Sequence, residues 1–282
     1  MNHVPIRTPD HSHLHHQHPG SHDQPRVLDL DAEVFGGNHA AVLDVAGVSA
    51  ARSVVDLGAG TGAGSRLLRG RYPDASLTCI DNDPEMLELL HRQGFAVVAA
   101  DLDDGLPVLA GTLNTSDAAV TAAGAPVDLV WASSSLHHLA NPARLLSGVR
   151  RALAPGGVLV VAELATLPRF LKNSPEALLE QRCHAAAAAE GWNRHPDWTP
   201  VLEVAGFGVT RSEVTTNAPV TPAAREYARQ WFARFLHLAA LTAEDRGAVE
   251  NLLEQFSDNI ELEPRATRTA WIATVDQNQK QP

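Results

Sequence analysis

The sequence predicts an α/β protein built on a doubly wound, mostly parallel sheet with helical cap elements. Short apolar runs without polar alternation recur along residues 53–164, as expected of strands buried on both faces. Helical patterns separate these runs, which implies right-handed crossovers between parallel strands. The chain has 282 residues, of which 44% are hydrophobic. This is enough for one large domain with a cap.

The core elements alternate in order along the chain. Helices are expected over residues 62–71, from Pro84 with Asp83 as N-cap, and from Pro142 with Asn141 as cap. Residues 110–126, rich in Gly, Ala, Thr and Ser, are expected to form a loop. We expect strands over residues 53–60, 76–83, 95–102, 127–134 and 157–164.

The pattern changes after Glu163. Residues 174–190 are expected to form a helix that stops at Gly191, and a helical pair is expected from Thr221-Pro222 to about Phe256. Residues 206–215 and 268–275 are expected to pair as an antiparallel hairpin at one sheet edge. Long insertions in compact domains are usually functional lids, so we expect cap elements at 26–49, 166–196 and 221–257 around a core at 50–165.

Residues 1–25 are predicted to be a disordered tail that precedes a domain over residues 26–282. Seven of the fourteen histidines lie in this tail, among Pro, Ser, Asp and Gln. Such a segment has too little apolar surface to order itself. A solvated tail is favoured over a metal-binding tract, although both remain open.

Charge and composition exclude several function classes. The net charge of −11 and the lack of a dense Lys/Arg run argue against nucleic-acid binding. No apolar run is long enough for a membrane span, and the start lacks the apolar segment of a secretory signal. Two cysteines suggest neither a disulfide framework nor a zinc site. We therefore expect a soluble cytoplasmic protein without a bound metal. Its oligomeric state stays open, a homodimer included.

The stretch "VVDLGAGTGAGS" (54–65) predicts a binding loop for a nucleotide or nucleoside. Glycine permits positive φ angles and a close approach of the backbone to a ligand, and the following helix N-terminus favours an anionic group. Gly58, Gly60 and Ala63 also fit the dinucleotide fingerprint. Ligands of such sheets bind at the carboxyl ends of the strands, which makes candidates of the polar residues there: Asp56, Asp81, Asp101, Ser133 and Glu163.

Two of these acids suit a nucleoside. Asp81 ends the second strand, 21 residues after Gly60, where a carboxylate can bind both ribose hydroxyls. Asp101 ends the third strand and could accept from an adenine amino group. Loop solvation is the alternative for Asp101, because Asp103 and Asp104 follow in the same turn.

Five ordered motifs resemble those of class I S-adenosylmethionine-dependent methyltransferases: "VVDLGAGTG", "CIDNDPEML", "AADLDD", "VDLVWASSSLHHL" and "LAPGGVLVVAEL". The resemblance covers about residues 50–165. It implies a seven-stranded sheet in the order 3-2-1-4-5-7-6 with an antiparallel seventh strand. It also implies S-adenosylmethionine as cofactor. The "NPPY"-type signature of adenine and glutamine methyltransferases is replaced by "ASSS", and the stretch Leu136–Leu139 resembles small-molecule members of the family, which implies a small-molecule acceptor.

The resemblance also implies a role for each cofactor-binding residue. Asp56 and the backbone of Gly58, Ala59, Gly60 and Gly62 would hold the methionine part of the cofactor. Asp81 would bind the ribose, and Ser133 would line the sulfonium side. Asn82, Asp101 and Leu102 would surround the adenine.

Methyl transfer from a sulfonium is an in-line displacement in which the protein mainly holds the reacting atoms in line. A general base is needed only when the nucleophile must lose a proton early. His137 and His138 follow the fourth strand and are the candidates for that base, with His195 behind them. Helix capping or packing is the alternative for each. Tyr227, Trp231, Phe232 and Phe235 form a stripe at helical spacing, for which packing is favoured over an acceptor-facing wall.

Two other function classes remain open. The shared glycine fingerprint also fits an NAD(P)-dependent oxidoreductase. A non-catalytic cofactor-binding module used for protein interaction is the third possibility. The sequence does not name the acceptor molecule or the acceptor atom.

Overall fold

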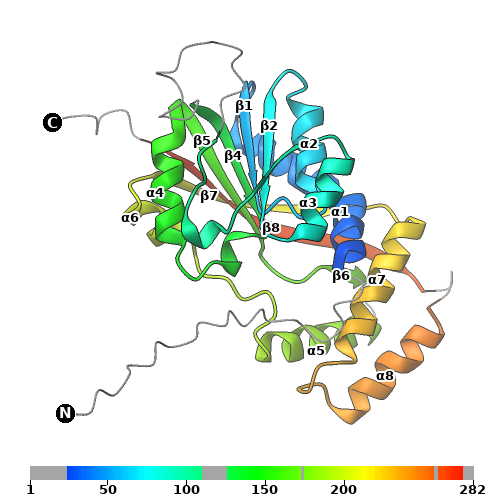
Figure 1. Cartoon of the computed structure of the whole chain (residues 1–282). Helices are drawn as coiled ribbons and strands as arrows, with labels where there is room; N and C mark the ends of the chain where they lie inside the picture. Colours follow the sequence, from blue (N-terminus) through cyan, green and yellow to red (C-terminus); the bar gives the residue numbers. More distant parts are fainter. Residues whose placement is uncertain (1–23, 110–125, 173–174, 257–259, 276–282) are drawn as a thin grey trace, which may run out of the picture.

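The structure is a computed structural model that describes residues 24–109, 126–172, 175–256 and 260–275. Within them, one mixed sheet is flanked by helices on both faces (Figure 1). The predicted tail falls almost entirely outside the described residues, and the predicted loop at 110–126 does so as far as residue 125. No helix of the described part is long and apolar enough to cross a membrane.

Five strands form the parallel part of the sheet. β1 lies at the centre, between β2 and β4, and the outer neighbours are β3 and β5. β1, β4 and the second half of β5 are buried almost throughout, which explains their unbroken apolar sequences. The bounds are Ser53–Leu57 for β1, Ser76–Asp81 for β2, Ala96–Ala99 for β3, Val127–Ser133 for β4 and Leu153–Leu164 for β5.

The antiparallel part of the sheet is organised by one long strand, β8 (Leu262–Thr274). It pairs with β5 on one side and, over residues 265–274, with β7 (Gly208–Asn217) on the other. The full order is β3-β2-β1-β4-β5-β8-β6, with β7 also on β8. When the three-residue β6 (Arg169–Leu171) is set aside, this is the predicted order 3-2-1-4-5-7-6. The predicted fold class is confirmed, with β6 as an addition.

Helices cover both faces of the core. α1 (Gln24–Ala46) and α2 (Ala63–Arg71) pack on the face that presents Trp131 and Val160. α3 (Pro84–Arg92) covers Cys79 on β2. α4 (Pro142–Ala152) and the short α6 (Thr199–Val204) pack on the opposite face, around Val130 and Leu159.

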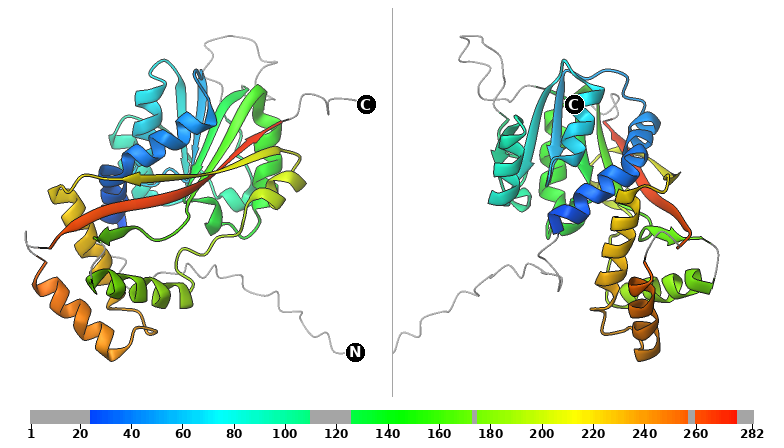
Figure 2. Two further views of the ribbon diagram at one scale, coloured as in Figure 1. Left: turned by 180° about the vertical axis from the view of Figure 1, so that it is seen from behind. Right: turned by 90° about the vertical axis from the view of Figure 1, so that its right-hand side faces the viewer.

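The cap consists of α5 (Pro175–Ala189), α7 (Pro222–Phe235), α8 (Ala243–Glu254), β6 and the first half of α1. These elements share a second apolar core below one end of the sheet (Figure 2). The aromatic stripe of α7 is buried there, against Phe35 of α1 and Phe170 of β6. Its side chains therefore build the interior of the cap.

The helix ends show where local sequence signals hold. Asp83 and Thr221 cap α3 and α7 through their side chains, as predicted. Asn141 occupies the predicted cap position of α4, but its side chain makes no capping hydrogen bond. Its N–H donates to the carboxylate of Asp103, 2.7 Å away. α1 begins at Gln24, inside the predicted tail, and bends at Phe35, where φ is −115° and ψ is 21°.

Candidate functional site

The glycine loop turns the chain from β1 into α2 with three left-handed residues. The φ angles of Gly58, Gly60 and Gly62 are 65°, 53° and 82°, values that only glycine adopts at low cost. Gly58 is also fixed by space, because a Cβ there would lie 2.6 Å from Cβ of Ser135. The loop thus lies against the residues that follow β4.

The N–H groups of this loop are already used within the protein. Gly58 and Ala59 both donate to the carbonyl oxygen of Ile80, at 2.9 and 3.0 Å, and Gly62 donates to Ala59. Gly60 donates to the carboxylate of Asp81, 2.8 Å away. A ligand on the loop would therefore meet Cα atoms and carbonyl oxygens rather than these N–H groups.

Asp81 stands at the carboxyl end of β2, directly beside the glycine loop. One carboxylate oxygen accepts from Gly60 and the other accepts from the N–H of Asp83, 3.0 Å away. The side chain is mostly buried, whereas the neighbouring Asn82 is exposed. Each carboxylate oxygen can accept more than one hydrogen bond, so Asp81 keeps capacity for hydroxyl donors.

Asp101 and Leu102 follow β3 at the same edge of the sheet. The exposed Asp101 accepts from the N–H of Asp103 at 3.0 Å and begins a short 3-10 turn over Leu102–Asp104. Leu102 is buried. Asp103 accepts from Ala140 and Asn141, which ties this turn to the start of α4. Asp101 and Asp103 therefore both anchor the backbone of this acidic turn.

Asp56 lies beneath the loop on β1 and is buried. Ser65 of α2 donates to its carboxylate at 2.6 Å. Burial raises the pKa of Asp56 to about 7; the hydrogen bond from Ser65 opposes this shift, and the charge of Asp81 adds to it. Gly64 fits closely here, since a Cβ at this position would lie 3.0 Å from Trp131 Nε1 and 3.2 Å from Asp56 Oδ2.

Ser133 ends β4 on the face covered by α1. Its hydroxyl lies 3.1 Å from Nε2 of His39, a residue of α1. Burial lowers the pKa of His39 to about 3; the positive charge of Arg268 also lowers this pKa, and Asp31 opposes the shift. His39 is therefore a neutral imidazole that fixes the Ser133 hydroxyl.

His137 and His138 lie in a 3-10 turn just after β4, with ring centroids 4.1 Å apart. They differ in their partners. Nδ1 of His137 lies 2.9 Å from a carboxylate oxygen of Glu163, the penultimate residue of β5. The His137 side chain is 27% exposed and that of Glu163 is 1% exposed. A buried carboxylate thus orients one imidazole, leaving Nε2 for a reacting group.

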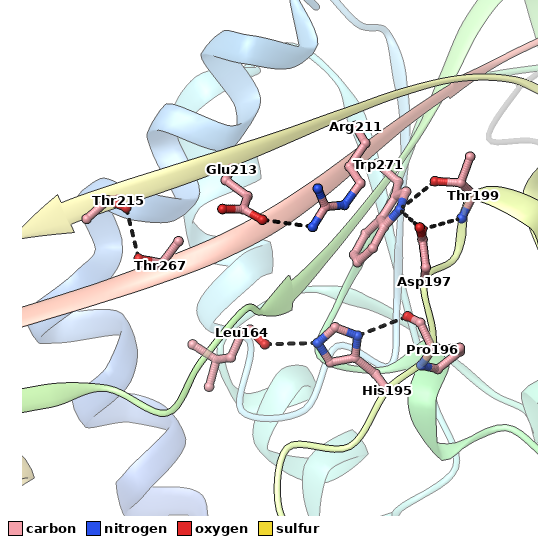
Figure 3. Close-up of polar contacts among 10 residues, drawn as sticks. All are labelled: Leu164, His195, Pro196, Asp197, Thr199, Arg211, Glu213, Thr215, Thr267 and Trp271. Carbon is pink, nitrogen blue, oxygen red and sulfur yellow. Dashed lines mark hydrogen bonds and ion pairs between the residues drawn. The ribbon is translucent and has the colours of Figure 1, made fainter. Parts of the chain in front are cut away.

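His195 contacts backbone carbonyl groups through both ring nitrogens (Figure 3). Nε2 lies 2.9 Å from the oxygen of Leu164 and Nδ1 lies 3.0 Å from that of Pro196. Next to it, Trp271 donates to Asp197 and Thr199. These contacts occupy the ring nitrogens that a general base would need, so His195 has a structural role beside Trp271.

A groove of about 500 Å³ runs between α1 and α2, beside the glycine loop. It begins at the first residue of α2 and includes His39 of α1. Its lining residues from the two helices include Ala32, Gly36, His39, Ala63, Arg66 and Leu67. The helix α1 therefore forms one wall of this groove and α2 forms the other.

Residues 26–49 were expected as a cap element, but three residues of this region were not among the predicted site residues. His39 and Asp31 come from α1, and Arg268 comes from β8. A signal existed for Arg268, since it is a charged residue in a largely buried strand. No local pattern marks His39, whose role depends on how α1 crosses the sheet. The described residues contain no group of three or more His, Cys, Asp or Glu side chains that could hold a metal ion.

Comparison with known proteins identifies a domain within the chain. Residues 55–159 match a family described as "Methyltransferase domain". Trans-aconitate 2-methyltransferase of Acidovorax sp. (strain JS42) is 36% identical over 114 residues, which cover 40% of this chain and 38% of that relative. Malonyl-[acyl-carrier protein] O-methyltransferase of Laribacter hongkongensis (strain HLHK9) is 34% identical over 137 residues, which cover 44% of this chain and 40% of the relative.

The chain therefore covers about two fifths of the length of these relatives. Among solved structures, Haemonchus contortus phosphoethanolamine N-methyltransferase 2, in complex with phosphomonomethylethanolamine and S-adenosylhomocysteine, is 15% identical with a TM-score of 0.48. That match covers 90% of this chain and 58% of the other.

Proposed function

We propose that this chain, in which residues 55–159 match a methyltransferase domain family, is a class I S-adenosylmethionine-dependent methyltransferase that transfers a methyl group to a small organic acceptor. The observation that carries the proposal is the glycine loop joined to Asp81, inside the segment that matches the family. The proposed domain covers residues 26–282, with its core at 50–165 and the cap on one side.

The residues at the strand ends suit this cofactor. The backbone is open at Gly60, where a Cβ would approach no atom closer than 3.9 Å, and we propose that the loop at Gly58, Ala59, Gly60 and Gly62 holds the methionine part there. We propose that Asp81 accepts from the ribose hydroxyls while holding the loop, and that Asp56 supports the methionine end from below. Asn82, Asp101 and Leu102 would surround the adenine, and Ser133 would face the sulfonium.

S-adenosylmethionine supplies a methyl group on a positively charged sulfur, and the C–S bond breaks as the bond to the acceptor forms, leaving neutral S-adenosylhomocysteine. The protein then needs to orient the acceptor and exclude water. We propose that His137 Nε2 takes the acceptor proton when the acceptor has one. Glu163 would hold the Nδ1–H tautomer that leaves Nε2 free.

Cofactor binding is tested by titrating the full chain with S-adenosylhomocysteine in a calorimeter. We expect saturable binding. Asp81→Ala should weaken it by about 1.5–3 kcal/mol, the scale of hydrogen bonds to a charged group. Asp83→Ala is the matched control, because it removes a helix cap on the next turn and leaves the Gly60–Asp81 bond intact. A folded wild-type chain that does not bind would refute the proposed function.

The role of His137 is tested by single-turnover methyl transfer from labelled S-adenosylmethionine. A hydroxy acid is the acceptor that must lose a proton, and trans-aconitate, whose carboxylates are already ionised at neutral pH, is the acceptor that need not. His137→Gln should lower the rate with the hydroxy acid by about 10²-fold or more, the contribution of a positioned base, and should change the rate with trans-aconitate much less. His138→Gln is the matched control, which keeps the bond to Glu163. Glu163→Gln should change the pH profile of the rate while leaving cofactor affinity intact. Equal losses for both histidine variants would contradict the assignment.

We also propose a cytoplasmic location and a small-molecule acceptor. Cys79 and Cys183 are both buried free thiols, which fits a reducing compartment. The formal charge of −11 disfavours a nucleic-acid partner. A homodimer remains one of the assemblies to test, by light scattering of the full chain.

A further inference from the structure

A buried arginine with unused donors lies at the edge of the proposed site. Arg268 on β8 is 1% exposed. One terminal nitrogen, Nη2, donates to Asp31 of α1, whereas Nε and Nη1 have no hydrogen-bond partner among the described residues. Buried guanidinium N–H groups without partners are unfavourable, so such an arrangement points to a ligand.

The surroundings hold this guanidinium in place. Asp31 accepts from Arg268 through one oxygen and from the hydroxyl of Tyr227 through the other, at 3.0 Å. Burial raises the pKa of Tyr227 well above its usual value, and the charge of Asp31 adds to this, so the hydroxyl stays a donor. Three elements, α1, α7 and β8, therefore fix the arginine before any ligand arrives.

Strand register places Arg268 near the methyl-transfer end of the sheet. It lies opposite Leu164, the last residue of β5, and Ser133 at the end of β4 pairs with Ala162 on the other side of β5. Residues 133, 162, 164 and 268 share one face, because partners across a ladder and residues two apart point the same way. Arg268 is thus two strand spacings, about 10 Å sideways, from Ser133.

We propose that Arg268 binds a carboxylate of the acceptor through its unpartnered N–H groups, because a buried guanidinium donates strong charge-assisted hydrogen bonds to a carboxylate. This inference rests on the proposed methyltransferase function and assigns the acceptor to the organic acids. The carboxylate of the cofactor is the other source of the same chemistry. The acceptor is favoured because the glycine loop follows β1, three strand spacings (about 14 Å) from β8 and on the far side of β4.

The test follows the Nε–H resonance of Arg268 by NMR in arginine-labelled full chain, with Arg268→Gln to assign the signal. Malonate is the probe, and malonamide and chloride are the controls. We expect a saturable shift with malonate alone, and an affinity for malonate at least about tenfold lower in Arg268→Gln. Absence of a shift with malonate, or an equal shift with chloride, would overturn the proposal.

The same samples are titrated with S-adenosylhomocysteine, which distinguishes a site for the acceptor carboxylate from a site for the cofactor carboxylate. Unchanged cofactor affinity in Arg268→Gln supports an acceptor site, whereas a tenfold loss with unchanged malonate binding overturns it. A wild type that binds malonate but not S-adenosylhomocysteine would refute the methyltransferase function and leave the anion site standing.

Two further variants serve as controls. Because Arg268→Gln leaves the charge of Asp31 without its counter-charge, the double variant Asp31→Asn/Arg268→Gln repeats each titration without a buried charge. Arg268→Lys keeps the charge and removes the planar set of N–H donors, so its malonate affinity should lie between those of the wild type and Arg268→Gln.

Discussion

Asp56 shows how one side chain couples the site to stability. Its carboxyl group is buried under α2, and burial is the main reason why its pKa is raised from 3.8 to about 7. The folded state therefore holds a proton that the unfolded chain releases above pH 4. Stability from this group is present at low pH and is lost as the pH rises from about 4 to about 7.

We expect Asp56→Asn to remove this pH dependence. Measured by urea denaturation without ligand, the wild type should lose up to about 4 kcal/mol relative to the variant between pH 4 and pH 7. Ser65→Ala, which removes the opposing hydrogen bond, should enlarge the same loss in the presence of Asp56. If the difference in free energy of unfolding between the wild type and Asp56→Asn does not change between pH 4 and pH 7, the pKa of Asp56 is not raised by folding and the prediction is wrong.

For single residues, the sequence predicted where a side chain lies on its strand better than it predicted the hydrogen bonds that the side chain makes. Asp81 lies at the expected strand end, yet its bond to the N–H of Gly60 depends on the exact turn of the loop. The choice between His137 and His138 could not be made from adjacent identical residues. It depends on Glu163, a residue of another strand that parallel pairing brings to the same edge.

At the scale of elements, α2 can approach β1 closely because its second residue is glycine. The space beside Gly64 is bounded by Trp131 and Asp56, both buried. Gly70 lies six residues further along the same helix, where an added Cβ would meet nothing within 4 Å. Substituting Gly64 therefore tests packing against the sheet, whereas substituting Gly70 tests helix propensity alone.

We expect Gly64→Ala to destabilise the protein by about 1–3 kcal/mol, the cost of overpacking a rigid site. Gly70→Ala should instead stabilise it by about 0.5–1 kcal/mol, because alanine loses less chain entropy in a helix. Urea denaturation of both variants checks the pair. Equal effects of the two substitutions on stability would mean that α2 moves away from the sheet and makes room for the alanine side chain.

Element ends were predicted where the signal is local. Asp83 and Thr221 cap their helices through hydrogen bonds to residues two or three positions ahead. The start of α4 is different, since the carboxylate of Asp103 reaches it from the turn after β3. Such long-range capping leaves no trace in the sequence around Asn141. The short α6 and β6 were missed for a related reason: tertiary contacts stabilise them more than their own sequences do.

At the scale of the whole molecule, the sequence predicted the strand order and the antiparallel hairpin but not the length of β8. Residues 262–267 extend the strand beyond the predicted start at 268 and alternate buried with exposed or half-buried side chains. This extension pairs with β6 and with the end of β7, so one strand belongs to both the core and the cap. The burial of Arg268 depends on this continuity.

The position of β8 has a consequence for biosynthesis. β8 follows β5, β6 and β7 in the chain but lies between β5 and β7 in the sheet. During translation, the hydrogen-bonding edges of β5 and β7 emerge from the ribosome before their shared partner exists. Unpaired edges of this kind recruit other strands and promote aggregation. A nascent chain halted before residue 262 would therefore be the species that most needs a chaperone.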